Sequence, residues 1–130
     1  MSKIRSLASH IPRVLLGLAM TAFGLMGLFM QMEPPPTLSA EALAFSNALK
    51  NSGYMNQMIA LVQIVSGVAL LANRFVPLAL LFLAPFFVNA VLFHAFLERS
   101  GLVPSLVFAA LHLGVAWQRR EAFSQVLKAR

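Results

Sequence analysis

The stretch VPLALLFLAPFFVNAVLFHAFL, residues 76–97, carries no charged side chain and decides the fold. Three other windows of the chain are equally free of Asp, Glu, Lys and Arg. The four windows hold 19, 23, 23 and 19 residues and lie between Arg13 and Glu33, between Lys50 and Arg74, between Arg74 and Glu98, and between Arg99 and Arg119. A helix needs about 20 mostly apolar residues to cross a bilayer core of roughly 30 Å. The sequence therefore predicts an all-α integral membrane protein, built as a four-helix bundle.

Prolines and short polar turns place the four predicted spans at about residues 11–32, 54–72, 76–97 and 102–118. Pro12 suits a first helical turn, and Pro34-Pro35-Pro36 ends the first span because proline lacks the amide hydrogen that a helix needs. The later connections are short, so neighbouring spans are expected to run antiparallel, up-down-up-down. All 130 residues are thus expected to form a single membrane domain.

The longer connection between the first two spans contains a further helix pattern at residues 39–50. Ser39 can cap the N-terminus of this helix. Its apolar stripe consists of Leu38, Ala42, Phe45 and Leu49. The pattern predicts a short helix that lies at the membrane interface. The tail at residues 119–130 is predicted to be a basic amphipathic segment.

The composition excludes several classes of function. The chain is 59% hydrophobic and has no cysteine, which rules out thiol redox chemistry, thiolate metal sites and disulfides. The net charge of +6 does not indicate nucleic acid, because the basic residues flank apolar spans instead of covering a soluble face. The sequence has no carboxylate pair, glycine-rich phosphate loop or catalytic triad. No catalytic residue and no metal site is therefore predicted.

Basic residues are distributed unequally between the two ends of the predicted bundle. Eight share the side of both termini, namely Lys3, Arg5, Arg13, Arg74, Arg119, Arg120, Lys128 and Arg130. The opposite side has only Lys50 and Arg99. Since Lys and Arg favour cytoplasmic loops, we expect a multi-pass membrane protein with both termini in the cytoplasm. The last four basic residues, Arg119, Arg120, Lys128 and Arg130, are expected to contact lipid headgroups of the inner leaflet.

Five polar side chains lie deep within the predicted spans. From the helical rise, Gln63 and Asn89 lie about 13 Å below the outer boundary, and His112 lies about 15 Å below it. Thr21 and Ser66 lie at about 18 Å by the same measure. Hydrocarbon offers these groups no partner, so we expect one cluster inside the bundle. Such a cluster either joins the helices or binds a ligand or proton, and the sequence leaves both readings open.

A second polar set is predicted near the outer surface and consists of His94, Asn56, Gln57 and Gln31. His94 and His112 are also the pair that a haem would need as axial ligands. His94 lies about 9 Å shallower than His112 by the helical rise, which disfavours a bis-histidine haem.

Several short runs along the chain stand in a distinctive order. They are RVLLGL at residues 13–18, VQIVSGVALL at 62–71, RFVPLAL at 74–80, AP at 84–85, VN at 88–89 and LFH at 92–94. Over residues 12–120 this order resembles the DoxX and DoxX-like family of small bacterial membrane proteins. The resemblance implies a four-helix fold in the bacterial inner membrane. It also implies an association with quinone-linked or stress-related redox assemblies, including thiosulfate:quinone oxidoreductase subunits. The family often has an acidic residue at the position of Gln63 and a lysine near Gly27, so both charges are missing here.

Three functions are consistent with the sequence. The first is a non-catalytic subunit of a larger redox- or energy-linked bacterial membrane complex, which binds protein partners and lipid. The second is a quinone-interacting subunit of a membrane oxidoreductase, in which Gln63, Asn89 and His112 bond the quinone oxygens. The third is a small solute transporter that acts as a homodimer, joined by the small residues of span 1. The missing charges favour the first function, because proton-coupled chemistry at the midplane would need an acid or a base there.

Overall fold

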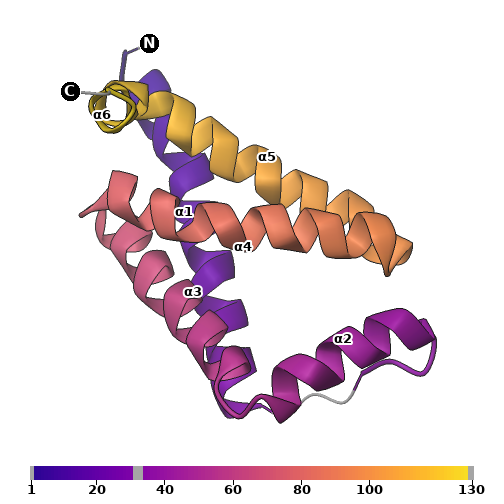
Figure 1. Ribbon diagram of the computed structural model, residues 1–130. Helices are drawn as coiled ribbons and strands as arrows, with labels where there is room; N and C mark the ends of the chain where they lie inside the picture. Colours follow the sequence, from indigo (N-terminus) through magenta and orange to yellow (C-terminus); the bar gives the residue numbers. More distant parts are fainter. Residues whose placement is uncertain (1, 31–33, 129–130) are drawn as a thin grey trace.

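The computed structural model describes residues 2–30 and 34–128, and these residues form α-helices and one 3₁₀-helix with no strand (Figure 1). In chain order the elements are α1 (Ser2–Phe29), α2 (Ala40–Asn51), α3 (Met55–Ala72), α4 (Val76–Phe96), η1 (Arg99–Gly101), α5 (Leu102–Gln118) and α6 (Arg120–Val126). Four helical stretches of the described residues are long and apolar enough to cross a membrane. They are α1, α3, α4 and the continuous stretch of η1 and α5. The predicted all-α, four-span fold is confirmed.

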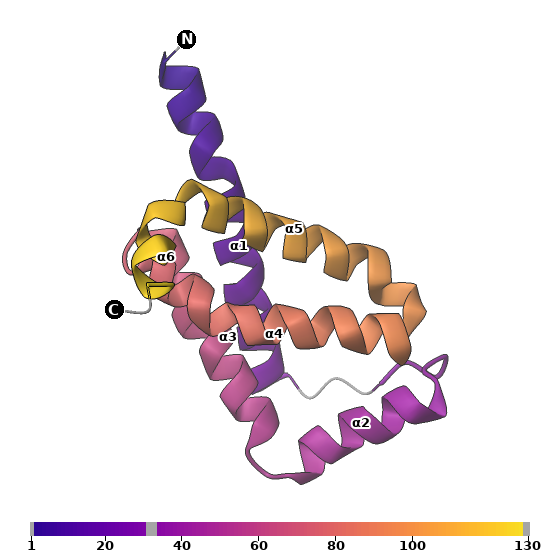
Figure 2. The same cartoon turned by 45° about the horizontal axis from the view of Figure 1, so that its top comes forward.

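The four long helices are arranged as two antiparallel pairs, α1 with α3 and α4 with α5. Figures 1 and 2 show that the pairs meet at the end where α3 turns into α4, which is also the end of both termini. Towards the other end the pairs diverge, and α2 spans the distance between the end of α4 and the start of α3. The bundle is therefore wedge-shaped, with α2 across its open side.

The hydrophobic core lies at the end where the pairs meet. Its fully or almost fully buried side chains are Leu16, Met20, Leu70, Val76, Ala79, Leu80, Leu83, Phe87 and Val115. On α4 these residues all precede Asn89, whereas the later residues of this helix are partly or fully exposed. Packing is thus densest near the α3–α4 turn, and the opposite half of the bundle has room for a cavity.

The α3–α4 turn is held by two residues in the left-handed region. Asn73 has φ 56° and caps α3, with its amide donating to carbonyls of the last turn. The amide of Arg74 donates to the carbonyl of Ala69 at 3.0 Å, which completes a common C-terminal capping motif. Phe75 has φ 55° and precedes Pro77, whose fixed φ suits the first turn of α4. This tight turn brings the end of α3 directly beside the start of α4.

The short helix α2 is attached at both of its ends. The hydroxyl of Ser39 donates to the carbonyl of Leu97 at 2.7 Å and accepts from the amide of Ala42 at 3.2 Å, so one side chain joins α2 to the end of α4. The rings of Phe45 and Phe93 lie 5.4 Å apart. Ala42 is completely buried, as its place on the apolar stripe predicts. Gly53, with φ 85°, makes the turn into α3.

Helix α1 begins nine residues before the start predicted for the first span. Its first turns are exposed and project beyond the rest of the bundle (Figure 2). Pro12 lies inside α1 and not in its first turn. The helix continues past it towards the N-terminus because the preceding residues contain no glycine or further proline to stop it. The predicted C-terminal tail is a separate short helix, α6.

We expect the end that carries both termini to be cytoplasmic, because it also carries Arg13, Arg74 and Arg119. The absence of native cysteine allows a direct test. Asn47→Cys, exposed on α2, should react with an impermeant maleimide added to intact cells, and Ser6→Cys, exposed on α1, should react only after the membrane is permeabilised. The reverse labelling pattern would show that the termini lie on the outer side of the membrane.

Candidate ligand pocket

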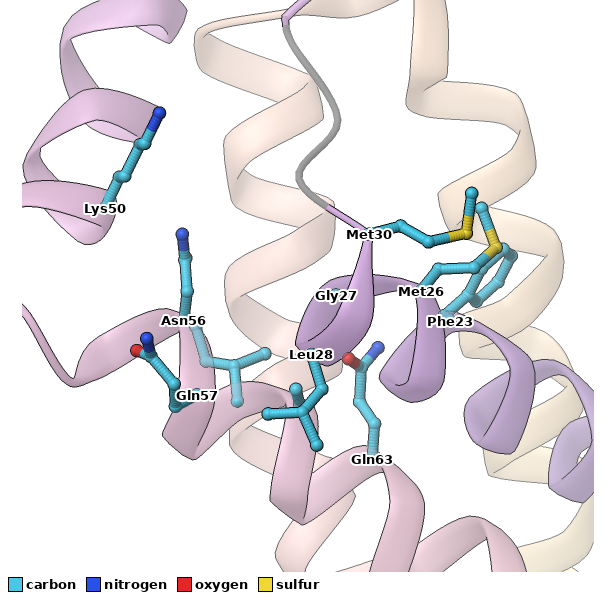
Figure 3. Close-up of a pocket in the computed structure, with 11 residues that line it drawn as sticks. Phe23, Met26, Gly27, Leu28, Met30, Lys50, Asn56, Gln57 and Gln63 are labelled. Carbon is cyan, nitrogen blue, oxygen red and sulfur yellow. The ribbon is translucent and has the colours of Figure 1, made fainter.

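A cavity of about 430 Å³ opens beneath the end of α2, between α1 and α3 (Figure 3). A volume of this size is typical of sites for small organic ligands. The lining residues are Phe23, Met26, Gly27, Leu28 and Met30 from α1 and the residue after it, Lys50 from α2, and Asn56, Gln57, Ile59, Ala60 and Gln63 from α3. Three segments that are separate in sequence thus build one site.

Gln63 is the most unusual residue of this cavity. Only 7% of it is exposed, and its amide extends from α3 into the cavity (Figure 3). None of the side-chain hydrogen bonds formed between described residues involves this amide. The polar atoms of this amide are not fully enclosed by protein but are open to the cavity, where water or a ligand can bond them.

The cavity is polar at its rim and apolar on its walls. Lys50, Asn56 and Gln57 are all exposed and lie at the end nearest α2. Asn56 precedes Gln63 by two helical turns, which separates them by about 10 Å along α3. Between these levels the α1 wall is formed by Phe23, Met26 and neighbouring apolar residues. This arrangement suits an elongated, amphipathic molecule with polar groups that meet both levels.

Gly27 leaves space on the α1 wall of the cavity. Among the described residues, a Cβ atom added at this position would have only the Ala60 Cβ within 4 Å, at 3.7 Å. Gln63 and Gly27 therefore line the same cavity. At or near these two positions, the family that the sequence resembles often has charged residues. Nothing in the sequence by itself indicated that these two positions lie together.

The predicted deep cluster of Gln63, Asn89 and His112 does not form. His112 is 7% exposed, its Nε2 donates to the carbonyl of Leu80 at 2.8 Å, and its ring lies 5.1 Å from that of Phe87. This histidine joins α5 to α4. Asn89 is exposed, because it lies about 200° around α4 from the buried Phe87. Depth estimated from the helical rise could not predict which of these side chains meet, because it does not specify the direction in which a side chain points.

The two deepest members of that predicted cluster, Thr21 and Ser66, do not line the cavity. The Thr21 hydroxyl donates to the carbonyl of Gly17 at 2.8 Å within α1, and its side chain lies against Gly67 of α3. Ser66 is 3% exposed on α3. Thr21 therefore belongs to the contact between α1 and α3.

The predicted outer set is divided in the same way. His94 Nδ1 lies 3.0 Å from the carbonyl oxygen of Glu98 and 3.3 Å from its Oε2, so this histidine belongs to the turn after α4. Glu98 also caps η1, and the hydroxyl of Ser100, which donates to its carboxylate, lowers the pKa of Glu98. Asn56 and Gln57 line the cavity instead, and Gln31 lies outside the described residues.

The basic residues predicted to contact lipid have different environments. Arg119 Nη2 donates to Asn73 Oδ1 at 2.7 Å, which ties the end of α5 to the α3–α4 turn. The guanidinium of Arg120 lies 4.9 Å from the centre of the Trp117 ring. Lys128 is exposed, and Arg130 lies outside the described residues.

Arg13 has a structural role that the sequence analysis missed. Only 8% of it is exposed, and its guanidinium donates to the carbonyl of Leu70, to that of Leu71 at 3.4 Å, and to His10 Nδ1 at 3.0 Å. It therefore neutralises the C-terminal end of α3, where carbonyl groups lack helical partners and attract positive charge. Its spacing of three and seven residues from the buried Leu16 and Met20 was the available signal, because that spacing puts all three on one helix face.

The family model of DoxX matches residues 8–95, which cover most of α1, all of α2 and α3, and nearly all of α4. The matched segment contains every residue that lines the cavity. No curated protein and no solved structure matches the chain.

Proposed function

Because this chain belongs to the DoxX family, we propose that it binds a membrane-dissolved quinone in the cavity beneath α2, as a non-catalytic subunit of a redox-linked membrane assembly. The observation that carries the proposal is the amide of Gln63, which extends from a largely buried side chain into the cavity and has no hydrogen-bond partner among the described residues. The coarser part of this statement, a small multi-pass membrane protein, follows from the family and from the four candidate spans.

A quinone matches the distribution of polar and apolar groups in the cavity. Its flat ring is apolar on both faces, and its two carbonyl oxygens lie at opposite ends of the ring and only accept hydrogen bonds. The Gln63 side chain has two N–H donors and can bond one oxygen. Lys50 and Asn56, which carry donors at the rim, can bond polar groups at the other end. The aromatic and thioether side chains of Phe23 and Met26 are suited to contact the ring.

The absence of charge at Gly27 and Gln63 favours a neutral ligand. An acid or a lysine at these positions would bring a charge into the bilayer core, and a buried charge is stable only when it is paired. Glycine and glutamine avoid this requirement. Gly27 also leaves open the volume that a longer side chain would occupy, because only one atom of the residues that the structure describes lies within 4 Å of an added Cβ.

The remaining part of the proposal is the role as a subunit. Binding a quinone does not reduce or oxidise it, so electrons would come from a partner protein. The resemblance to subunits of quinone-linked assemblies supports this arrangement. In this arrangement, the chain holds the quinone at a fixed depth in the membrane, where the partner protein can exchange electrons with the quinone.

Gln63→Leu is expected to weaken quinone binding by at least about tenfold, equivalent to 1.4 kcal/mol. The change keeps a similar size but removes both N–H donors. Binding of a radiolabelled short-chain quinone to the protein in nanodiscs would measure the effect. Gln125→Leu, on exposed α6, is the matched control and should bind as the unchanged protein does.

Two further measurements make the result decisive. Gly27→Leu, whose Cβ would lie 3.7 Å from the Ala60 Cβ, should occupy part of the cavity and should also reduce binding. The thermal stability of each variant should be recorded, so that a loss of folding is not mistaken for a loss of binding. Equal quinone binding by Gln63→Leu and the unchanged protein, or binding no greater than that of empty nanodiscs, would contradict the proposed function.

A further inference from the structure

Helix α4 has an exposed face with the repeat of a coiled-coil contact. The face consists of Leu78, Phe82, Pro85, Asn89, Leu92 and Phe96, which follow one another at alternating steps of four and three residues. Every one of the six is exposed, and Phe82 and Phe96 are 58% and 79% exposed. A repeat of 3.5 residues is the pattern by which two helices pack along their whole length.

Asn89 lies near the middle of this face and of the 21-residue helix. Its side chain makes no hydrogen bond with any residue in the described parts of the chain, and it does not line the cavity. On the outer surface of a membrane helix, lipid tails would surround it and offer neither donor nor acceptor. A polar group in this position requires a partner from another molecule.

We propose that the protein forms a parallel homodimer through this face of α4, with the two Asn89 side chains hydrogen-bonded to each other. A second copy is inserted in the same orientation, so its Asn89 lies at the same depth by necessity. An amide has both donors and an acceptor, and two amides related by a two-fold axis can therefore bond reciprocally. A single asparagine in a repeat of apolar residues also fixes the register and the number of helices.

Pro85 adds a second polar group to the same face. Proline has no amide hydrogen, so the carbonyl of Leu81, one turn earlier, lacks its helical donor. Leu81 is 41% exposed beside the repeat. Lipid tails offer this acceptor no donor, and the partner's Asn89, which has two N–H groups, is the one side chain of the face that can.

The small-residue stripe of α1, which the sequence suggested as the dimer contact, is already occupied. A Cβ added at Gly17 would lie 3.0 Å from the carbonyl oxygen of Gly67, and one added at Gly24 would lie 2.8 Å from that of Ala60. Both glycines therefore pack against α3 of the same chain. The proposed α4 contact shares no residue with the cavity, so dimer formation and quinone binding can succeed or fail separately.

Cysteine cross-linking in native membranes tests the contact, because the chain has no other cysteine. Leu92→Cys lies on the proposed face and is 48% exposed, and Val107→Cys on α5 is a control of similar exposure, 54%. Their depths are also similar, about 8 Å from the end of each predicted span. Mild oxidation should convert Leu92→Cys into a disulfide-linked homodimer and leave Val107→Cys monomeric.

The role of Asn89 is then tested by dilution. Energy transfer between labelled copies in lipid vesicles gives the dimer dissociation constant, which Asn89→Leu should raise about tenfold and Asn89→Gln should largely restore. Equal cross-linking at both cysteine positions, cross-linking of Leu92→Cys only to a different protein, or an unchanged dissociation constant for Asn89→Leu would each overturn the proposal.

Discussion

Gly67→Ala is expected to destabilise the protein by about 3 kcal/mol, because it forces α1 and α3 apart. A Cβ at this position would lie 2.7 Å from the Thr21 amide nitrogen and 2.9 Å from the carbonyl oxygen of Gly17, and still closer to the Thr21 hydroxyl. Two of these atoms belong to the backbone and cannot turn away. The helices must therefore separate, and close packing is the main attraction between helices in lipid.

Gly114→Ala is the matched control for this change. Gly114 also lies inside a membrane helix, α5, but an added Cβ would meet no atom of the described residues within 4 Å. Because alanine favours a helix over glycine by up to about 1 kcal/mol, this variant should be as stable as the unchanged protein or slightly more stable. Denaturant titration in a mild detergent measures both. A Gly67→Ala protein of normal stability would show that α1 and α3 do not approach as closely as the structure has them.

Arg13→Met is expected to cost about 2–3 kcal/mol, because hydrogen bonds from a charged group are worth about 1.5–3 kcal/mol. Methionine keeps much of the apolar stem but removes the guanidinium that bonds the carbonyls of Leu70 and Leu71. The C-terminal end of α3 then loses its positive charge, and with it part of the attachment between α1 and α3.

Arg5→Met separates this effect from a general loss of charge. Arg5 lies on the same helix, two turns earlier, and is exposed. Exposed substitutions usually change stability by less than about 0.5 kcal/mol. The two variants carry the same net charge, so a difference between them in denaturant titration reports the burial of Arg13. If both lose equal stability, the buried capping role assigned to Arg13 is wrong.

A substantial part of the fold was predictable, because the relevant signals are local. The charge-free windows gave the four spans, and Ser39 with its apolar stripe gave α2. The candidate site was predictable only in fragments. Gln63, Asn56 and Gln57 were singled out as polar residues in or near the membrane, but they were assigned to two different clusters. Lys50 carried no signal for the site, and Gly27 drew attention only through the family resemblance, since their roles depend on the position of α2 and on the gap left in the α1 wall.

The sequence by itself determined the number of spans, because placing a charge in hydrocarbon is unfavourable in any fold. It did not determine which face of each helix meets its neighbours. Lipid tails are as apolar as leucine, so a helix such as α4, with its apolar residues on every side, shows no contrast between an inner and an outer face. Only the tertiary structure decided that Gln63 points into a cavity, that Asn89 points outward and that Arg13 is buried. The physical reason is that contacts such as Gly67 against Thr21, and His112 against the Leu80 carbonyl, fix how each helix is rotated about its own axis.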